Sequence, residues 1–533
     1  MNTQSRRGFL ATAAGTRMVR AAPPLSAAEG ASKIAAQPQV IAEPYVRVVK
    51  SPHDWQAPPW VGSPSIVKTA SGRLLVCHDL FGTKENESSP TAYVHASDDG
   101  GRTWKPLARI PGLYWPSLFR CASGVYAIGV DRTFKTADNH IVITRASEDG
   151  RQWSTPSRLT APGLVCHTGN KGALVSRGRV TYSFELVPTL FKPLPRTTLL
   201  GTMNATEADL DARNIEVEVA DPSVFVAHTL VAVEDGKAAL HCRVLDAGPG
   251  KRLVLRPERW AGAAEGRPQN SPGPWRFASG TPLQIVSGMS KGLNRDFWET
   301  AIDADEKADL CDARVWRKAN AIGNPCYTQR KALKELFGFD YELRGHWLEG
   351  VLVRLEHPGA SGQIVNVLRA ANGVTGNLSA RVIVEDGAGQ LRCRFDRMGF
   401  DPGLGCVHCY IMYDAPGNLY WMTSNVNRDS TRYKPDQERA NLALFYSANC
   451  VDWFMAGLVA YAPDMIHSFN YSHFTIDGDD LLVISRSHVE SPLTESTRRS
   501  GQASAHDSNA ATFHRVRNFR TLANLEFLRY RTA

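Results

Sequence analysis

A short motif that recurs three times constrains the fold more than any other feature of this chain. It reads SDDGGRTW at 97–104, SEDGRQW at 147–153 and SANCVDW at 447–453, each after an alternating apolar segment typical of a β-strand. An Asp or Asn in each copy can accept backbone N–H groups, Gly supplies positive φ in the first two, and the final Trp can pack beneath the turn. The repeat therefore predicts hairpin turns in an all-β fold.

The motif resembles the Asp-box of sialidase-like β-propellers, and the resemblance implies a structural role for its residues. The residues to which we assign that role are Ser97, Asp99, Gly101 and Trp104 in the first copy and Ser147, Asp149 and Trp153 in the second. The alternative, that Asp99 and Asp149 are catalytic acids, is less favoured because turn chemistry accounts for both.

Strand-like segments around the motifs recur with the spacing of a propeller blade. Around the first copy we expect strands at 64–69, 73–79, 91–96 and 104–110, which is four strands in about 45 residues. Counting such strand pairs along the chain predicts a seven-bladed β-propeller of four-stranded antiparallel blades. A strand at 45–49 beside 511–516 would complete the last blade and protect the sheet edges.

Residues 258–345 are irregular and rich in Pro, Gly and Ala. We expect them to form a long insertion in or after the fourth blade, whose inner pair would be 224–233 with 237–245. The propeller would then occupy 40–525 as a single domain.

The amino terminus resembles a twin-arginine export signal. Arg6 and Arg7 precede Phe9, Leu10 and a short apolar stretch. We therefore expect residues 1–35 to be a signal or a disordered segment, and the protein to be exported to the periplasm or the medium. A disordered basic tail is the alternative. The sequence contains no run of about 18 uninterrupted apolar residues, so it predicts no membrane span.

Charge and cysteine content exclude several classes of protein. The chain has 61 Lys and Arg against 53 Asp and Glu, a net charge of +8 that is spread along the sequence. This dispersed charge argues against a nucleic-acid partner. Of the ten cysteines only Cys406 and Cys409 are close together, and no second pair completes a zinc pattern.

Other segments resemble a more specific group of propellers. They include LLVCHDLFG at 74–82, ADLCDARVW at 308–316 and HWLEG at 346–350. In this order they look like the seven-bladed lyases and α-L-rhamnosidases that act on rhamnosyl-glucuronate ends. The resemblance implies an enzyme that cleaves an acidic polysaccharide by β-elimination or hydrolysis. It also implies a central Ca²⁺, for which the sequence has no EF-hand-like spacing.

Candidate catalytic residues follow from the chemistry of uronate elimination, which needs a cation for the carboxylate, a base and an acid. His78 and His167 suit the proton transfers, unless they are packed between blades. Arg369 and Arg486, at equivalent ends of second strands, suit bidentate carboxylate binding; inter-blade salt bridges are the alternative.

Four more residues are candidates for contact with sugar. They are Trp115, Trp347, Glu349 and Tyr471, although aromatic residues on inner strands are more often core. Two other functions stay open. An exo-α-sialidase needs an arginine triad and a Tyr–Glu pair, which the sequence alone does not order. A non-catalytic glycan-binding propeller needs neither. The oligomeric state is left open.

Overall fold

The computed structural model describes most of the chain from residue 38 to residue 528. The segments outside the description are 1–37, 52–57, 135–137, 170, 249, 260–269, 287–296, 326–345, 358, 372–375, 388, 405–407, 429–437, 465, 491–505 and 529–533. The predicted export signal and Cys406 therefore lie outside the described residues. Val40–Ala533 forms one compact unit. No helix in the described ranges is long and apolar enough to cross a membrane.

The first two sheets follow the strand pattern expected around the Asp-boxes. The first contains, in order, β3 (Ser65–Lys68), β4 (Leu74–His78), β6 (Thr91–Ser97) and β7 (Lys105–Pro111). The second contains β8 (Tyr114–Cys121), β9 (Gly124–Val130), β10 (Ile141–Arg145) and β11 (Ser157–Arg158). Both are antiparallel throughout. A two-stranded pair and a helix accompany them, namely β2 (Trp60–Val61), β5 (Leu80–Phe81) and α2 (Lys84–Ser88).

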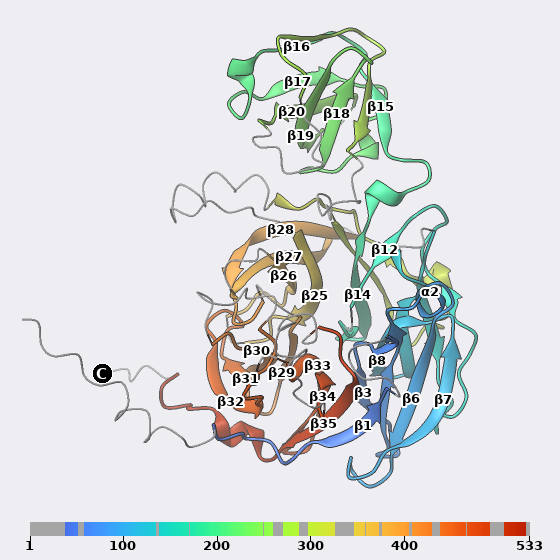
Figure 1. The fold of residues 1–533 in the computed structure, drawn as a ribbon, viewed down its shortest axis with the longest axis vertical. Coiled ribbons are helices and arrows are strands. Elements are labelled where there is room, and N and C mark those ends of the chain that lie inside the picture. Colours follow the sequence, from blue (N-terminus) through green and yellow to red (C-terminus); the bar gives the residue numbers. More distant parts are fainter. Residues whose placement is uncertain are drawn as a thin grey trace, which may run out of the picture. The chain divides into compact units, whose positions relative to one another are not determined.

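Three further four-stranded sheets come from the second half of the chain (Figure 1). One contains β25 (His346–Arg354), β26 (Ile364–Ala371), β27 (Leu378–Gly387) and β28 (Gln390–Phe400). The next contains β29 (Tyr410–Asp414), β30 (Leu419–Asn425), β31 (Leu442–Ser447) and β32 (Phe454–Ala460). The last contains β33 (Ser468–Asp477), β34 (Asp480–His488), β35 (Ala510–Val516) and β1 (Val46–Lys50). The pairing of β1 with β35 is the predicted closure of the last sheet by the start of the chain.

The remaining sheet of this type is interrupted by an insertion, and here the prediction was wrong. Its strands are β12 (Cys166–His167), β13 (Leu174–Ser176), β14 (Arg179–Leu186), β23 (Trp298–Asp305) and β24 (Arg317–Lys318). Residues 298–318, expected in the insertion, are thus part of the third sheet. The insertion lies between β14 and β23 instead of after a fourth blade.

The inserted segment forms its own six-stranded sheet. Its strands, in sheet order, are β15 (Arg196–Thr198), β22 (Pro282–Ile285), β18 (Leu230–Glu234), β19 (Ala239–Ala247), β20 (Arg252–Pro257) and β17 (Ile215–Glu218). The strands β16 (Met203–Ala205) and β21 (Trp275–Phe277) pair separately. The hairpin expected as the fourth blade is β18–β19 of this sheet. The described residues therefore form six blade-like sheets rather than seven, because an alternating hairpin looks the same in either setting.

One strand from each of the six sheets, the first in five of them and β13 in the third, takes part in a closed cycle of contacts. β3 contacts β8, and the cycle continues through β13, β25, β29 and β33 back to β3. Apolar side chains fill the space between neighbouring sheets; one cluster joins Leu75 and Val94 of the first sheet to Leu118 and Ala127 of the second. This cyclic packing makes the all-β architecture propeller-like and brings the starts of distant strands together.

The Asp-box residues make the contacts of a turn. Asp99 Oδ1 accepts N–H groups of Arg102 and Thr103, each at 3.0 Å, and Trp104 Nε1 donates to the carbonyl of Gly101 at 3.1 Å. Hydrogen bonds, foremost from the Thr103 side chain, hold the pKa of Asp99 well below its usual range.

The second and third Asp-boxes follow the same plan with one variation. Asp149 Oδ1 accepts from Ser147 Oγ at 2.6 Å, and Trp153 Nε1 donates to the carbonyl of Gly150 at 3.0 Å. In the third copy Trp453 Nε1 instead donates to buried Asp401, at 2.7 Å. In all three Asp-boxes these hydrogen bonds give the Asp or Asn and the Trp a structural role in the turn.

Candidate active site

Three first strands carry a bulge at equivalent points near their starts. The pairing register shifts within 114–117 on β8, 348–351 on β25 and 470–473 on β33. Within these shifts Trp115, Glu349 and Tyr471 adopt φ values of 50°, 54° and 47°. Positive φ is unfavourable for residues other than glycine, and such strain clusters at functional sites. The bulges thus single out three residues that the sequence also nominated.

Glu349 and Tyr471 meet although they come from different sheets. The hydroxyl of Tyr471 donates to Glu349 Oε1 at 3.2 Å, and Arg369 Nη1 donates to Glu349 Oε2 at 2.8 Å. Arg369 Nη1 also lies 3.3 Å from the Tyr471 hydroxyl and donates to it. All three side chains are at least nine-tenths buried. The phenol is therefore held between a carboxylate, which can take its proton, and a guanidinium.

Two more arginines lie against the ring of Tyr471. The guanidinium carbon of Arg486 is 4.0 Å from the ring centroid, and that of Arg439 is 5.4 Å away. Arg486 Nη2 and Arg369 Nε are buried and have no hydrogen-bond partner among the described residues. Buried N–H groups of arginine are costly without an acceptor. This cluster of Arg369, Arg439 and Arg486, which we call the arginine cluster, suits an anionic ligand.

The charge on Glu349 is maintained in spite of its burial. Burial by itself raises the pKa of a carboxyl group, but the positive charge of Arg369, followed by His408 and His167, outweighs it. The pKa of Glu349 therefore lies well below its usual range. Conversely, burial lowers the pKa of Arg486. Glu349 is thus held as a carboxylate that accepts the hydrogen bond from the Tyr471 hydroxyl.

Asp79 is a second carboxyl group near the arginine cluster, and it differs from Glu349 in charge. It follows β4, is fully buried, and accepts the Trp115 N–H at Oδ2 over 3.1 Å. Its Oδ1 has no hydrogen-bond partner within the described ranges. Burial, only partly offset by hydrogen bonds and by Arg486, raises the pKa of Asp79 to about 6. A carboxyl group with this pKa retains a proton in mildly acidic solution and can donate it.

The two histidines proposed from sequence have different surroundings. His78 is 2% exposed, donates from Nδ1 to the Asp79 carbonyl at 2.9 Å, and has Nε2 3.3 Å from Nε2 of His95. Burial and the neighbouring His95 lower the pKa of His78 to about 3. His78 is therefore a neutral, packed ring with both nitrogens engaged inside its own sheet, which favours a structural role over a catalytic one.

His167 lies close to the Tyr471–Glu349 pair. Its Nδ1 donates to Glu185 at 2.9 Å, and its ring stacks on Phe297 with centroids 4.9 Å apart. Trp115 meets the same ring edge-on at 4.8 Å. The half-buried Trp115 thus lies next to His167 in an aromatic wall, where it can contact a sugar face. Trp347, in contrast, is fully buried and donates to the Phe297 carbonyl at 2.8 Å, so it belongs to the core.

The structure thus brings together most of the predicted site residues and adds others. Arg369, Arg486, Glu349 and Tyr471 converge, with His167 and Trp115 nearby, whereas Trp347 does not take part. The candidates from the sequence did not include Arg439 or Asp79. Arg439 stands between β30 and β31 with no motif around it, so the sequence carried no signal for it.

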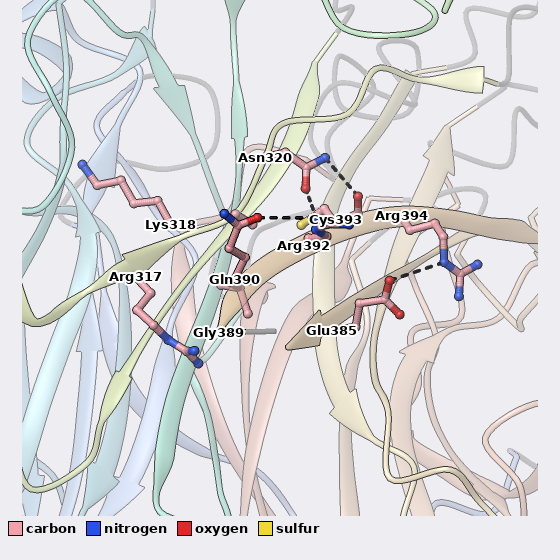
Figure 2. A pocket seen from close by; sticks show the side chains of 11 residues that line it. Arg317, Lys318, Asn320, Glu385, Gly389, Gln390, Arg392, Cys393 and Arg394 are labelled. Carbon is pink, nitrogen blue, oxygen red and sulfur yellow. Dashed lines mark hydrogen bonds and ion pairs between the residues drawn. The ribbon is translucent and has the colours of Figure 1, made fainter. Parts of the chain in front are cut away.

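Two further cavities are lined by other residues, although Lys171, the ion-pair partner of Glu185, lines the second. A groove of about 670 Å³ between β24 and β28 is basic, but its Arg394 faces Glu385 and its Asn320 is bonded to the main chain of Cys393 (Figure 2). A second cavity of about 710 Å³ is lined by the six strands of the closed cycle. Within the described ranges no group of three or more His, Cys, Asp or Glu residues is placed to hold a metal ion, so we derive no step through calcium.

No protein-family model and no curated protein matches this chain. Solved structures do match it. An α-L-arabinanase of Penicillium chrysogenum, complexed with arabinobiose, is 10% identical, with a TM-score of 0.42 over 89% of this chain and 98% of that one. A Hadza microbial sialidase is 11% identical, with a TM-score of 0.44 over 86% of this chain and 66% of that one. A Trypanosoma rangeli sialidase mutant with trans-sialidase activity is 10% identical, with a TM-score of 0.42 over 92% and 61%. The chain is thus similar, at low identity, to arabinanase and sialidase structures, and it spans about two thirds of the length of those sialidases.

Proposed function

We propose that this protein cleaves the glycosidic bond of a sugar that carries a carboxylate. The observation that supports this most is the position of Tyr471: its hydroxyl contacts Glu349 and Arg369, and two further arginines lie over its ring. The arginine cluster supplies N–H groups for the carboxylate, and the Tyr–Glu pair supplies a nucleophile with its base.

Hydrolysis with retention follows naturally from this arrangement. The arginine cluster would bind the substrate carboxylate and place the anomeric carbon at Tyr471. Tyr471 would attack that carbon while its proton passes to Glu349, and Asp79 would protonate the leaving oxygen. Water would then attack the anomeric carbon and give a proton to Asp79, while the tyrosyl–sugar bond breaks and Tyr471 recovers its proton from Glu349. A phenol is a suitable nucleophile here because a carboxylate would be repelled by the substrate's own negative charge.

β-Elimination from a 4-linked uronate, such as a rhamnose-capped glucuronate, is the second candidate. It is favoured by the direct contact between Arg369 and the Tyr471 hydroxyl. A base beside the group that neutralises the carboxylate is what removal of the C5 proton requires. The C5 proton would pass to the oxygen of Tyr471 as the phenolic proton passes to Glu349. The C4–O bond would break as Asp79 protonates the leaving oxygen, which leaves an unsaturated uronate.

A substrate panel tests the proposal and separates the two reactions. Aryl glycosides of sialic, glucuronic and galacturonic acid and a rhamnose-capped glucuronate polysaccharide are incubated with wild type and with Y471F. On the polysaccharide, hydrolysis releases rhamnose without absorbance at about 235 nm, whereas elimination produces that absorbance; on the aryl glycosides, hydrolysis releases the phenol. Turnover that Y471F abolishes supports the proposal. Binding of these glycans without turnover would support a non-catalytic propeller instead and overturn it.

We also propose that the enzyme is exported by the twin-arginine route and meets its acidic glycan outside the cytoplasm. The supporting observation is the Arg6–Arg7 pair before Phe9 and Leu10. Replacing both arginines by Lys should leave the protein in the cytoplasm of its host, as fractionation would show; unchanged export would contradict this route.

A further inference from the structure

A single buried carboxylate contacts two residues of the candidate site, Glu349 and His167. Glu185, on β14, is fully buried. Its Oε1 accepts the main-chain N–H of Glu349 at 2.7 Å and is paired with Lys171, and its Oε2 accepts Nδ1–H of His167 at 2.9 Å. Both carboxylate oxygens are therefore engaged by groups that lie at or next to the Tyr471–Glu349 pair.

The contact with Glu349 falls at the strained point of β25. Glu349 has a φ of 54° inside a bulge, a conformation that a residue with a side chain leaves unless its surroundings hold it. The carboxylate of Glu185 provides a charge-assisted acceptor for the N–H of that same residue. The side chain of Glu349 can meet Tyr471 only while this main-chain conformation lasts.

Glu185 has a cross-strand neighbour of the same type whose pKa is shifted in the opposite direction. Glu299 on β23 is its register partner and accepts a hydrogen bond from Asn366 at 2.7 Å. Burial and the charge of Glu185 raise the pKa of Glu299 well above its usual range, although Lys171 opposes this; Lys171 and His167 lower that of Glu185 against its burial. The surroundings thus favour the negative charge on Glu185, the member that contacts Glu349, over a charge on Glu299.

We propose that Glu185 is a positioning residue, which holds the main chain of Glu349 in the strained conformation that presents its carboxylate to Tyr471, and holds the ring of His167 with the proton on Nδ1. This inference rests on the proposed function for its effect on turnover. Its structural part concerns the hydrogen bonds from the main-chain N–H of Glu349 and from Nδ1–H of His167, which can be measured without a substrate.

The neighbouring glutamates provide a matched pair of variants. E185Q removes the carboxylate that contacts Glu349 with almost no change of shape, whereas E299Q makes the same change at the neighbour, whose pKa burial raises well above its usual range. We expect E185Q to lower kcat by about 100-fold or more with KM changed less than about threefold, because only the placement of Glu349 is lost. E299Q should stay within about threefold of wild type in both constants.

Two NMR signals report the contacts directly. In protein labelled with ¹⁵N-histidine, long-range correlations should show His167 protonated on Nδ1 in wild type and E299Q, and altered in E185Q. In protein labelled with ¹⁵N-glutamate, the amide signal that is lost in E349Q should move upfield in E185Q. Since Lys171 is left without its partner in E185Q, the double variant K171Q/E185Q repeats both measurements with the charge balanced.

The outcomes separate the inference from the proposed function. If E185Q retains kcat within about threefold of wild type, or leaves both NMR signals unchanged, the positioning role is overturned. If wild type turns over no substrate but the two signals move only in E185Q and K171Q/E185Q, the proposed function fails while the hold on Glu349 and His167 stands.

Discussion

The hydroxyl of Tyr471 lies 3.2 Å from Oε1 of Glu349, across 122 residues of sequence and between two different sheets. Both residues occupy bulges at equivalent points of their first strands, β33 and β25. A propeller-like ring brings such points together on its axis. The contact is therefore a consequence of the cyclic packing, and the chemistry proposed above depends on it.

Replacing either Tyr471 or Glu349 should impair the same catalytic step. We expect Y471F and E349Q each to lower kcat by about 1000-fold, and the double variant to lower it no further, because residues that act as a unit are not additive. Steady-state kinetics of the four proteins test this. Additive losses would show that the two side chains act independently.

Carboxylate recognition should depend on Arg486. R486M is expected to raise KM by about 100-fold for a carboxylated aryl glycoside, since a buried charge-assisted contact is lost. For the methyl ester of the same substrate, which lacks the charge, wild type and R486M should have similar KM values. A KM penalty of equal size for both substrates would place Arg486 outside the carboxylate subsite.

The carboxyl group of Asp79 should lower the free energy of unfolding at neutral pH, where it is forced to ionise inside the protein. Its pKa is raised from 3.8 to about 6, so the folded state disfavours the ionised form. This penalty is absent below the unfolded-state pKa, grows as pH rises between the two values, and is complete above the folded-state pKa. D79N should therefore stabilise the protein by up to about 3 kcal/mol near pH 8, and not near pH 3.

Denaturant unfolding of wild type and D79N at several pH values measures this difference, and a constant difference would contradict it. Activity provides a second readout. D79N should slow the release of poor leaving groups far more than that of activated aryl groups, because only the former need a proton donor.

His78 should influence acid stability more than turnover. Its pKa is lowered from 6.5 to about 3, so the folded state requires the neutral ring. The stability that this provides is complete above the unfolded-state pKa and is lost as pH falls toward the folded-state value. H78N should be less stable at neutral pH but show a shallower loss of stability between about pH 6 and pH 4. A large fall in kcat with unchanged stability would instead restore a catalytic role.

Two tryptophans provide a contrast between core and site. W347A should destabilise the protein by about 3–5 kcal/mol, because a fully buried indole and its hydrogen bond are lost. W115A should cost far less stability and mainly raise KM. Thermal unfolding and kinetics of both variants check this, and a reversed pattern would move the sugar-contacting surface elsewhere.

Several particular features could be predicted from sequence because they are local. The Asp-box turns follow from side chains within a few residues of each other, and the alternating segments around them predict the strands of the first two sheets. The placing of β1 beside β35 follows from the need to close a sheet edge. The hairpin β18–β19 was misplaced because its pattern shows that a strand pair exists and not which sheet it joins.

By itself, then, the sequence determined an all-β chain of short antiparallel strands with Asp-box turns, and nominated Arg369, Arg486, Glu349 and Tyr471 one at a time. Only the tertiary structure decided that the blade-like sheets in its described part are six, that the insertion divides the third, and that these four side chains meet with Arg439. The physical reason is range. Turns and alternation are set by neighbours in sequence, whereas burial, pKa and the meeting of charges depend on strands hundreds of residues apart.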